Sequence, residues 1–272
     1  MHPKFFDVHT HVPFAAYEKD REAVIRRARD EGVWMINVGT EKYTSLNAVQ
    51  LAESVPEGMY ATVGLHPIHT DKSFHDKQEF GSEGKESSSL GEVFDMAAYR
   101  ELASSKKVVA IGECGLDYYR LAEETKAKQY AAFEAQIALA NELNLPLMLH
   151  IRNAYRDAYD ILKTHARVKG NVHFFAGTWE EAKLFLNMGF TLSFTGVVTF
   201  ARTYDETIKN APRAQILSET DAPYVAPVPH RGRRNEPAYV SAVARAIAEI
   251  RGEPEETVLE ALVANARRVF SV

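Results

Sequence analysis

Short apolar runs alternate along the whole chain with longer segments of helical periodicity. The apolar runs predict strands over residues 4–8, 33–38, 59–63, 108–111, 147–149, 171–174, 190–193 and 214–217. The longer segments predict helices over residues 17–31, 45–54, 94–105, 123–143, 155–167, 180–188, 204–210, 236–251 and 255–270. Strands that lack a polar alternation are typical of parallel sheets buried on both faces.

Eight strand–helix units in a chain of 272 residues are the number found in a (β/α)8 TIM barrel. A doubly wound open sheet is the alternative, but it usually carries a glycine-rich phosphate loop after its first strand. Here that position reads Asp7-Val8-His9-Thr10-His11-Val12, without a glycine. The sequence therefore predicts an α/β fold of the TIM-barrel type, in one domain over residues 1–272.

One segment interrupts the alternation. Residues 71–92 are polar and rich in serine, glycine and glutamate, and they follow the third predicted strand. A barrel places one of its active-side loops at that point. The segment is either a solvated insertion or a lid or rim over one side of the site, and its composition favours the solvated insertion.

The composition, with 46% hydrophobic and 25% charged residues, is that of an ordinary globular protein. The single cysteine, Cys114, excludes a disulfide framework and a cysteine-based zinc site, and it is typical of a reducing compartment. No apolar run reaches the ~18 residues of a membrane span, and residues 1–8 do not resemble a signal peptide. We therefore expect a cytoplasmic protein. The net charge of −5 argues against a generally basic nucleic-acid-binding surface but leaves room for a local basic site.

Histidines and acids stand at the ends of several predicted strands, where a barrel gathers its chemistry. The residues are His9, His11, Glu113, His150, His173 and Asp221. Taken singly, each has an ordinary structural explanation: His150 could be a hydrogen-bonded core histidine, and Asp221 could cap a turn. Taken together, they would project into one mouth, where clustered carboxylates repel each other unless cations compensate them.

The spacing and number of these residues indicate two metal ions. His9 and His11 stand two apart on an extended segment, so their side chains point the same way. Four imidazoles and two carboxylates exceed the roughly three protein ligands that one catalytic ion needs. The set suits two divalent ions about 3.5–4 Å apart that share one carboxylate. Its imidazoles favour zinc, manganese, cobalt or nickel over magnesium.

With these residues, the chain resembles the TatD-type metal-dependent hydrolases and deoxyribonucleases. The resemblance runs from Phe6 almost to the C-terminus and rests on a series of motifs in order. They are Phe6-Asp7-Val8-His9-Thr10-His11, Gly64-Leu65-His66-Pro67, Ile111-Gly112-Glu113-Cys114-Gly115-Leu116-Asp117-Tyr118-Tyr119, Leu145-Pro146-Leu147-Met148-Leu149-His150-Ile151-Arg152, His173-Phe174-Phe175-Ala176-Gly177, Leu192-Ser193-Phe194-Thr195-Gly196, Glu219-Thr220-Asp221-Ala222-Pro223-Tyr224 and Arg231-Gly232-Arg233-Arg234-Asn235-Glu236-Pro237.

The resemblance implies an amidohydrolase-like barrel with a binuclear metal centre. One ion would be held by His9, His11 and Asp221, the other by His150 and His173, and Glu113 would bridge them. The resemblance implies magnesium, manganese or zinc as the ions, with cobalt or nickel as further candidates. The chain departs from the family around Arg152 and at Phe174-Phe175-Ala176, where the family often has Cys-Phe-Ser. These departures concern substrate preference more than metal binding.

A hydroxide shared between two such ions is a strong nucleophile at neutral pH. Beside the bridging Glu113, Asp221 would orient the attacking water and take its proton. His66 would contact the scissile phosphate or protonate the leaving group, and a hydrogen bond within the rim is its alternative role. Substrate contacts are predicted at Arg152, Arg231, Arg233, Arg234 and Tyr118, because arginines suit phosphate oxygens and aromatic rings stack on bases.

The sequence contains no helix-turn-helix, zinc finger or basic helix that would read a base sequence. We therefore expect a 3′–5′ exonuclease on single-stranded DNA, with RNA as a second substrate, and the resemblance implies the same activity. The alternative is a metallohydrolase of esters or amides, such as an aminoacyl-tRNA deacylase, because the same hydroxide serves both reactions. A non-catalytic metal-binding protein is disfavoured, since none of the six ligands is missing. No heptad seam indicates a partner, and a monomer is assumed.

Overall fold

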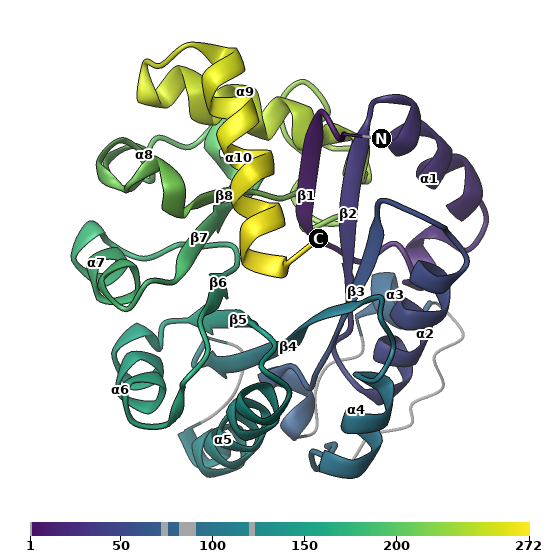
Figure 1. Cartoon of the computed structure of the whole chain (residues 1–272), viewed down its shortest axis with the longest axis vertical. Coiled ribbons are helices and arrows are strands. Elements are labelled where there is room, and N and C mark those ends of the chain that lie inside the picture. The colour runs from purple at the N-terminus through teal and green to yellow at the C-terminus, as the bar shows by residue number, and fades with distance from the viewer. Residues whose placement is uncertain (1, 72–75, 82–90, 120–122) are drawn as a thin grey trace.

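The chain folds into a nearly closed ring of eight parallel strands with helices around it (Figure 1). This computed structural model describes residues 2–71, 76–81, 91–119 and 123–272. Each strand pairs with the next in chain order, and β8 returns to β1 through a parallel bridge between Thr10 and Ala222. The predicted TIM barrel is confirmed, and the doubly wound open sheet is excluded.

The strands lie where the apolar runs predict them, and helices follow them along the chain. The strands are β1 (Phe5–Thr10), β2 (Val33–Val38), β3 (Met59–Val63), β4 (Val108–Asp117), β5 (Leu147–Arg152), β6 (Gly170–Val172), β7 (Thr191–Phe194) and β8 (Ile216–Ser218). The α-helices are α1 (Arg21–Asp30), α2 (Lys42–Glu53), α3 (Lys77–Phe80), α4 (Met96–Leu102), α5 (Lys126–Leu143), α6 (Tyr155–His165), α7 (Trp179–Asn187), α8 (Asp205–Asn210), α9 (Val240–Arg251) and α10 (Glu255–Phe270). The short 3-10 helices are η1 (Ala15–Tyr17), η2 (Pro67–Thr70), η3 (Glu123–Thr125), η4 (Gly196–Thr199), η5 (Arg213–Gln215) and η6 (Pro237–Tyr239).

Several predicted boundaries differ from the observed elements, among them those of β4 and of the first predicted helix. The strand predicted over residues 108–111 continues to Asp117, because Gly112 and Gly115 adopt φ values of +146° and +140° and let β4 run close against β5. The helix predicted over residues 17–31 is two elements, η1 and α1. Between these two elements the chain forms turns with i→i+3 hydrogen bonds, which do not continue the helix.

Two apolar layers hold the barrel together. The larger layer lies between the strands and the outer helices and includes Phe133 of α5 and Phe185 of α7. The second joins Met148 of β5 and Leu217 of β8 to Phe270 of α10. Because these strands stand on different sides of the ring, the second layer fills the barrel interior, and α10 covers it from the side of the strand starts. Polar chemistry is thereby left to the carboxyl ends of the strands.

The polar segment predicted over residues 71–92 is described only at residues 71, 76–81 and 91–92, and its remainder lies outside the described residues. Residues 77–80 form the short helix α3, in which the Glu79 side chain is only 7% exposed. This helix packs beside η1, which follows β1. The described part of the segment therefore packs against the rest of the barrel.

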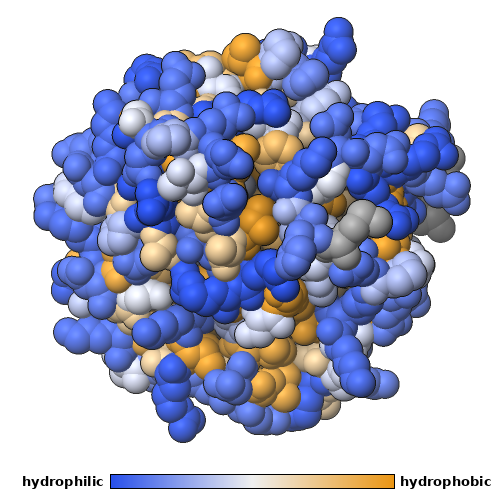
Figure 2. All heavy atoms as spheres, turned by 45° about the horizontal axis from the view of Figure 1, so that its top comes forward, coloured by the Kyte–Doolittle hydropathy of each residue, from blue (hydrophilic) through white to orange (hydrophobic). Residues whose placement is uncertain are grey.

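Hydrophilic residues dominate the face of the molecule in Figure 2, with hydrophobic residues in smaller groups between them. Within the described ranges, each helix falls short of the length and apolar character that crossing a bilayer requires. Large exposed hydrophobic side chains in these ranges include Tyr119 and Phe200. An arginine lies over each of these two rings.

We expect Gly115→Ala to destabilise the fold strongly. A Cβ at Gly115 would lie 2.0 Å from the carbonyl oxygen of His150, and the φ of +140° disfavours L side chains. Gly252→Ala is the matched control, because Gly252 has a φ of +64° but no atom within 4 Å of the added Cβ. Urea or thermal unfolding should show a loss of about 3 kcal/mol or more for Gly115→Ala and about 1 kcal/mol for Gly252→Ala. Equal losses would contradict the close packing of β4 on β5.

Candidate metal centre

All six predicted metal ligands converge at the carboxyl ends of the strands, around Glu113 from β4. One oxygen of this carboxylate, Oε1, lies 3.0 Å from Nδ1 of His150 and 3.0 Å from Nε2 of His173. The other oxygen, Oε2, lies 3.3 Å from Nε2 of His9. The two oxygens of Glu113 therefore face different histidines.

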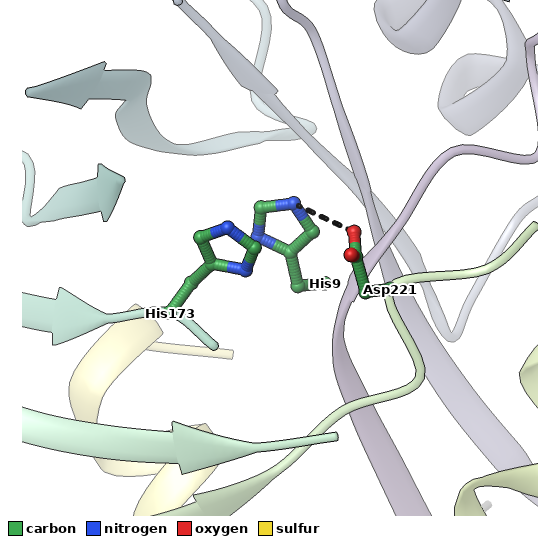
Figure 3. Close-up of side chains that lie close together, drawn as sticks. All are labelled: His9, His173 and Asp221. Atoms are coloured by element: carbon green, nitrogen blue, oxygen red, sulfur yellow. Dashed lines mark ion pairs between the residues drawn. The ribbon is translucent and has the colours of Figure 1, made fainter. Parts of the chain in front are cut away.

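Asp221 and the histidine pair at the end of β1 form the other half of the cluster. The Nε2 atoms of His9 and His11 are 3.2 Å apart. Oδ1 of Asp221 lies 3.4 Å from Nε2 of His11 and 3.8 Å from Nε2 of His9. Figure 3 shows His9 between Asp221 and His173, and the ring of His173 stacks on that of His9 with centroids 3.6 Å apart.

The seam between β8 and β1 sets the height of these side chains. The backbone N–H of Asp221 donates to the carbonyl oxygen of His9 at 2.9 Å, and the N–H of His11 donates to that of Ala222 at 2.8 Å. Asp221 adopts a φ of +53°, a conformation that acidic residues tolerate better than most. Segments from the two ends of the chain thus place three of the six side chains through mutual backbone hydrogen bonds.

The donor set fits divalent cations. Two ligands about 2.1 Å from one tetrahedral ion lie about 3.4 Å apart, and several neighbouring donor atoms here are 3.0–3.4 Å apart. Burial alone would raise the pKa of Glu113, but the interaction with the neighbouring histidines, first of all the charge of His173, and the hydrogen bond with His150 outweigh it and hold that pKa well below its usual value. Burial lowers the pKa of His9 to about 3, so its ring is neutral at pH 7. An ionised carboxylate among imidazole nitrogens is the kind of ligand set that transition metals prefer.

Three of the histidines have an acceptor oxygen beside the ring nitrogen that points away from the centre. The pairs are His11 Nδ1 with the Val38 carbonyl oxygen at 3.0 Å, His150 Nε2 with Asp117 Oδ2 at 2.9 Å, and His173 Nδ1 with Glu219 Oε1 at 3.3 Å. An acceptor beside one ring nitrogen favours the proton on that nitrogen in the neutral ring. The other nitrogen then presents its lone pair to the centre, which is how metal-binding histidines are oriented.

His66 has the opposite arrangement. Its Nδ1 accepts a hydrogen bond from the backbone N–H of Ile68 at 3.0 Å, and a backbone N–H can only donate. The proton of the neutral ring is therefore on Nε2, which lies 3.4 Å from Oε1 of Glu113. His66, Glu113 and His150 are close enough to hold an ion together, but a protonated nitrogen has no lone pair to offer. His66 is thus a hydrogen-bond donor that faces the centre.

Residues 6–271 match the sequence model of the family described as TatD related DNase. The chain belongs to this family. It is 38% identical over 272 residues to the uncharacterized metal-dependent hydrolase YabD of Bacillus subtilis, with 98% of this chain and 99% of that protein covered. It is 35% identical over 280 residues to the 3′-5′ ssDNA/RNA exonuclease TatD of Pantoea ananatis, with 98% and 99% covered. The crystal structure of YJJV, a TatD homolog from Escherichia coli, matches with a TM-score of 0.83 at 30% identity over 100% of both chains. The predicted TatD-type metal-dependent hydrolase is confirmed.

Two carboxylates of this TatD-family site, Asp117 and Glu219, were not among the predicted site residues. Besides facing His173, Glu219 accepts hydrogen bonds from the backbone N–H of Phe174 and from the hydroxyl of Ser193, both at 2.6 Å. Both acids are buried. Their positions in the sequence could have indicated this role. Each stands in the same strand-end motif as a predicted ligand, where a solvated acid is not expected.

Three predicted substrate residues of this TatD-family chain, Arg152, Arg231 and Arg233, are exposed. The guanidinium of Arg152 lies 3.9 Å from the ring centroid of Tyr119, and that of Arg231 lies 4.0 Å from the ring centroid of Phe200. Both rings are themselves exposed. Each pair therefore presents a flat cationic and aromatic surface to solvent.

Arg234 and Tyr118, also predicted to contact substrate, have their polar atoms engaged within the protein. Arg234 binds the two carboxylate oxygens of Asp20 at 2.6 and 2.8 Å and lies over the ring of Tyr17. The hydroxyl of Tyr118 contacts Oδ2 of Asp157 at 2.6 Å. Both side chains therefore have structural partners.

We expect Asp117→Asn to weaken metal binding by about 10–100-fold. The substitution keeps the shape of the side chain but removes the negative charge beside Nε2 of His150. Asp157→Asn is the matched control, since Asp157 accepts hydrogen bonds from two tyrosines and is not among the acids around Glu113. Competition with a chromophoric chelator for zinc measures both affinities. Equal affinities in the two variants would show that Asp117 does not orient His150.

Proposed function

We propose that this chain is a 3′–5′ exonuclease that removes nucleotides from single-stranded DNA, with single-stranded RNA as a second substrate. The observation that carries the proposal is the cluster around Glu113, with the donor His66 aimed at the same point. A metal-loaded cluster of this kind activates water toward a phosphodiester. The choice of substrate is supported by relatives named 3′-5′ ssDNA/RNA exonuclease at 35% and 36% identity.

Two divalent ions are proposed for the centre. His9, His11 and Asp221 would hold one ion, His150 and His173 the other, and Glu113 would bridge them. The two faces of Glu113 support a bridge, because Oε1 faces His150 and His173 while Oε2 faces His9. Imidazole-rich ligation favours zinc or manganese, with cobalt, nickel and magnesium as alternatives. Bound there, such ions would polarise the phosphate and make water a stronger nucleophile at neutral pH.

Asp221 is proposed to move a proton, and His66 to donate a hydrogen bond. The Asp221 side chain is 12% exposed, whereas that of Glu113 is 4% exposed, so water reaches Asp221 more easily. Asp221 would orient the attacking water and accept its proton. His66 would donate a hydrogen bond from Nε2 to a phosphate or leaving-group oxygen and keep its proton, because a neutral ring that lost it would become an imidazolate. The hydrogen bond from Ile68 supports this role, since it keeps that hydrogen on the side of the centre.

The substrate strand is proposed to lie over Arg152, Arg231 and Arg233. Their guanidinium groups would neutralise phosphates. Tyr119 and Phe200 would offer faces on which bases stack, an interaction of about 1–3 kcal/mol per base.

Arg234 and Tyr118 are proposed to stabilise the rim and not to bind substrate, because their polar groups already bind Asp20 and Asp157. The whole chain is proposed to act as one catalytic unit, since β1 and β8 lie near its opposite ends and both supply candidate ligands. A monomer in the cytoplasm is proposed, and the free, buried thiol of Cys114 supports a reducing compartment.

A time course on a 5′-labelled single-stranded DNA oligonucleotide tests the proposed activity. The chelated protein should leave the strand intact, and manganese, magnesium or zinc should restore a ladder that shortens one nucleotide at a time. Glu113→Ala should lose about 10³-fold or more of the rate, because it removes the carboxylate shared by both ions.

An intact oligonucleotide with every metal, from protein shown to bind ions, would contradict the exonuclease. Release of amino acid from aminoacyl-tRNA by the same preparation would then identify the alternative, an ester hydrolase.

Removing an exposed arginine at the mouth should weaken substrate binding more than turnover. We expect Arg152→Ala and Arg231→Ala each to raise KM for single-stranded DNA severalfold, and to reduce the slope of log KM against log salt by about 0.7. Arg156→Ala is the control, because Arg156 is an exposed arginine on α6 that pairs with Asp160. The same salt dependence in all three variants would exclude a phosphate contact for Arg152 and Arg231.

A further inference from the structure

Helix α3 closes one side of the barrel mouth and is fastened to loops that follow three strands. The hydroxyl of Tyr224, after β8, donates to Oδ2 of Asp76 at 2.7 Å. His69, after β3, places Nε2 3.3 Å from Oε1 of Glu79. Thr40, after β2, donates a hydrogen bond to the same oxygen of Glu79. The backbone of α3 packs beside η1, which follows β1. The helix is therefore a built part of the rim.

These fastenings bring the acids of α3 close to the metal centre. The ring of Tyr224 stands edge-on to that of His11, with centroids 6.3 Å apart, and the ring of His69 stands edge-on to that of His66 at 6.2 Å. Burial alone would raise the pKa of Glu79, but the hydrogen bond and charge of His69 outweigh it and lower that pKa. Glu79 is thus ionised at neutral pH. It contacts His69, whose ring stands beside that of His66 at the metal centre.

The surroundings of α3 are acidic on balance. The acids that belong to it or are in contact with its neighbours are Glu41, Asp71, Asp76, Glu79, Glu92 and Asp95, and the basic groups are Lys42, His69, Lys77 and Lys128. Lys42 and Lys128 already pair with Asp95 and Asp71. His69 in turn pairs with Glu79, so among the described residues the acid of this helix end that has no such cationic partner is Asp76.

Two of the exposed arginines, Arg152 and Arg231, lie over aromatic rings that follow β4 and β7, across the ring of strands from most of the residues that fasten α3. Arg152 ends β5, and Arg231 lies over Phe200, which follows β7 and η4. In a ring with the order β1 to β8, β5 stands across from β1, and β7 across from β3. A single strand that binds these arginines therefore reaches the metal centre with α3 directly ahead of it.

We propose that α3 is an end wall for the substrate, so that only a strand terminus is seated at the centre and a 3′-hydroxyl is accepted far better than a 3′-phosphate. This inference rests on the proposed exonuclease function. A strand that continued past the cleaved bond would have to displace α3 and bring its next phosphate against Asp76, where like charges repel, and against the Glu79–His69 pair. A 3′-hydroxyl brings no charge and can donate a hydrogen bond to a carboxylate.

The test compares three single-stranded DNA substrates of one sequence, cleaved by the metal-loaded full chain. They are a linear strand with a 3′-hydroxyl, the same strand with a 3′-phosphate, and the ligated circle. We expect kcat/KM for the 3′-hydroxyl strand to exceed that for the 3′-phosphate strand by about tenfold or more, and the circle to stay intact. The ratio of the two linear strands measures how strongly the site rejects a charged 3′ end. The circle measures whether α3 blocks a strand that has no end.

Two variants remove one negative charge each from the wall. Asp76→Asn and Glu79→Gln should reduce the preference for the 3′-hydroxyl by about threefold or more, by speeding hydrolysis of the 3′-phosphate strand. Asp76→Asn retains a residue that caps helices well, so α3 should stay folded even if Glu79→Gln loosens it. Tyr224→Phe removes the tether to Asp76 and should permit slow cleavage of the circle.

Glu180→Gln is the matched control, because Glu180 is an exposed acid on α7 that pairs with Lys183. It should leave the end preference unchanged. Equal rates on the two linear strands, rapid cleavage of the circle, or an unchanged preference in both Asp76→Asn and Glu79→Gln would overturn the end wall while the exonuclease function stands. Failure to cleave any of the three strands, from protein with its ions bound, would overturn both.

Discussion

A carboxylate buried at the centre of the barrel mouth is the constraint on which the rest of the site depends. Ring nitrogens of four histidines, His9, His66, His150 and His173, lie within 3.4 Å of Glu113. An uncompensated charge at this depth would cost several kcal/mol. The ends of β1, β3, β5 and β6 must therefore stand at matching heights around β4. The register of the strands therefore also determines the geometry of the candidate metal centre.

The seam that closes the barrel carries a second buried carboxylate, Asp7. It accepts hydrogen bonds from the backbone N–H of His9 and from the N–H and hydroxyl of Thr220, while the carbonyl of His9 accepts from Asp221. Closure of the ring and placement of two candidate ligands thus use the same few atoms. A change at this seam disturbs fold and site together, whereas a change at Asp117 acts on the orientation of one histidine.

The sequence specifies the barrel and the candidate ligands more completely than the contacts around them. Each strand could be predicted because it is buried on both faces and forms an apolar run, and His9 and His11 because alternation places both on one side. Asp117 could not be given a role from the sequence. Which nitrogen of His150 lies beside it depends on how β4 and β5 pack together. The pairing of Arg234 with Asp20 could not be predicted either, because the two residues are far apart in the sequence and become neighbours only in the folded barrel.

Helix α3 extends this argument from the centre to the choice of substrate. Its polar composition indicates a solvated loop, and nothing in its local sequence predicts the contacts with Thr40, His69 and Tyr224. None of these three residues is a candidate metal ligand, so the wall can change while the centre stays as it is. If α3 is the end wall, two tasks are physically separate. The ligands at the strand ends determine whether a bond is hydrolysed, and α3 determines which bond reaches them.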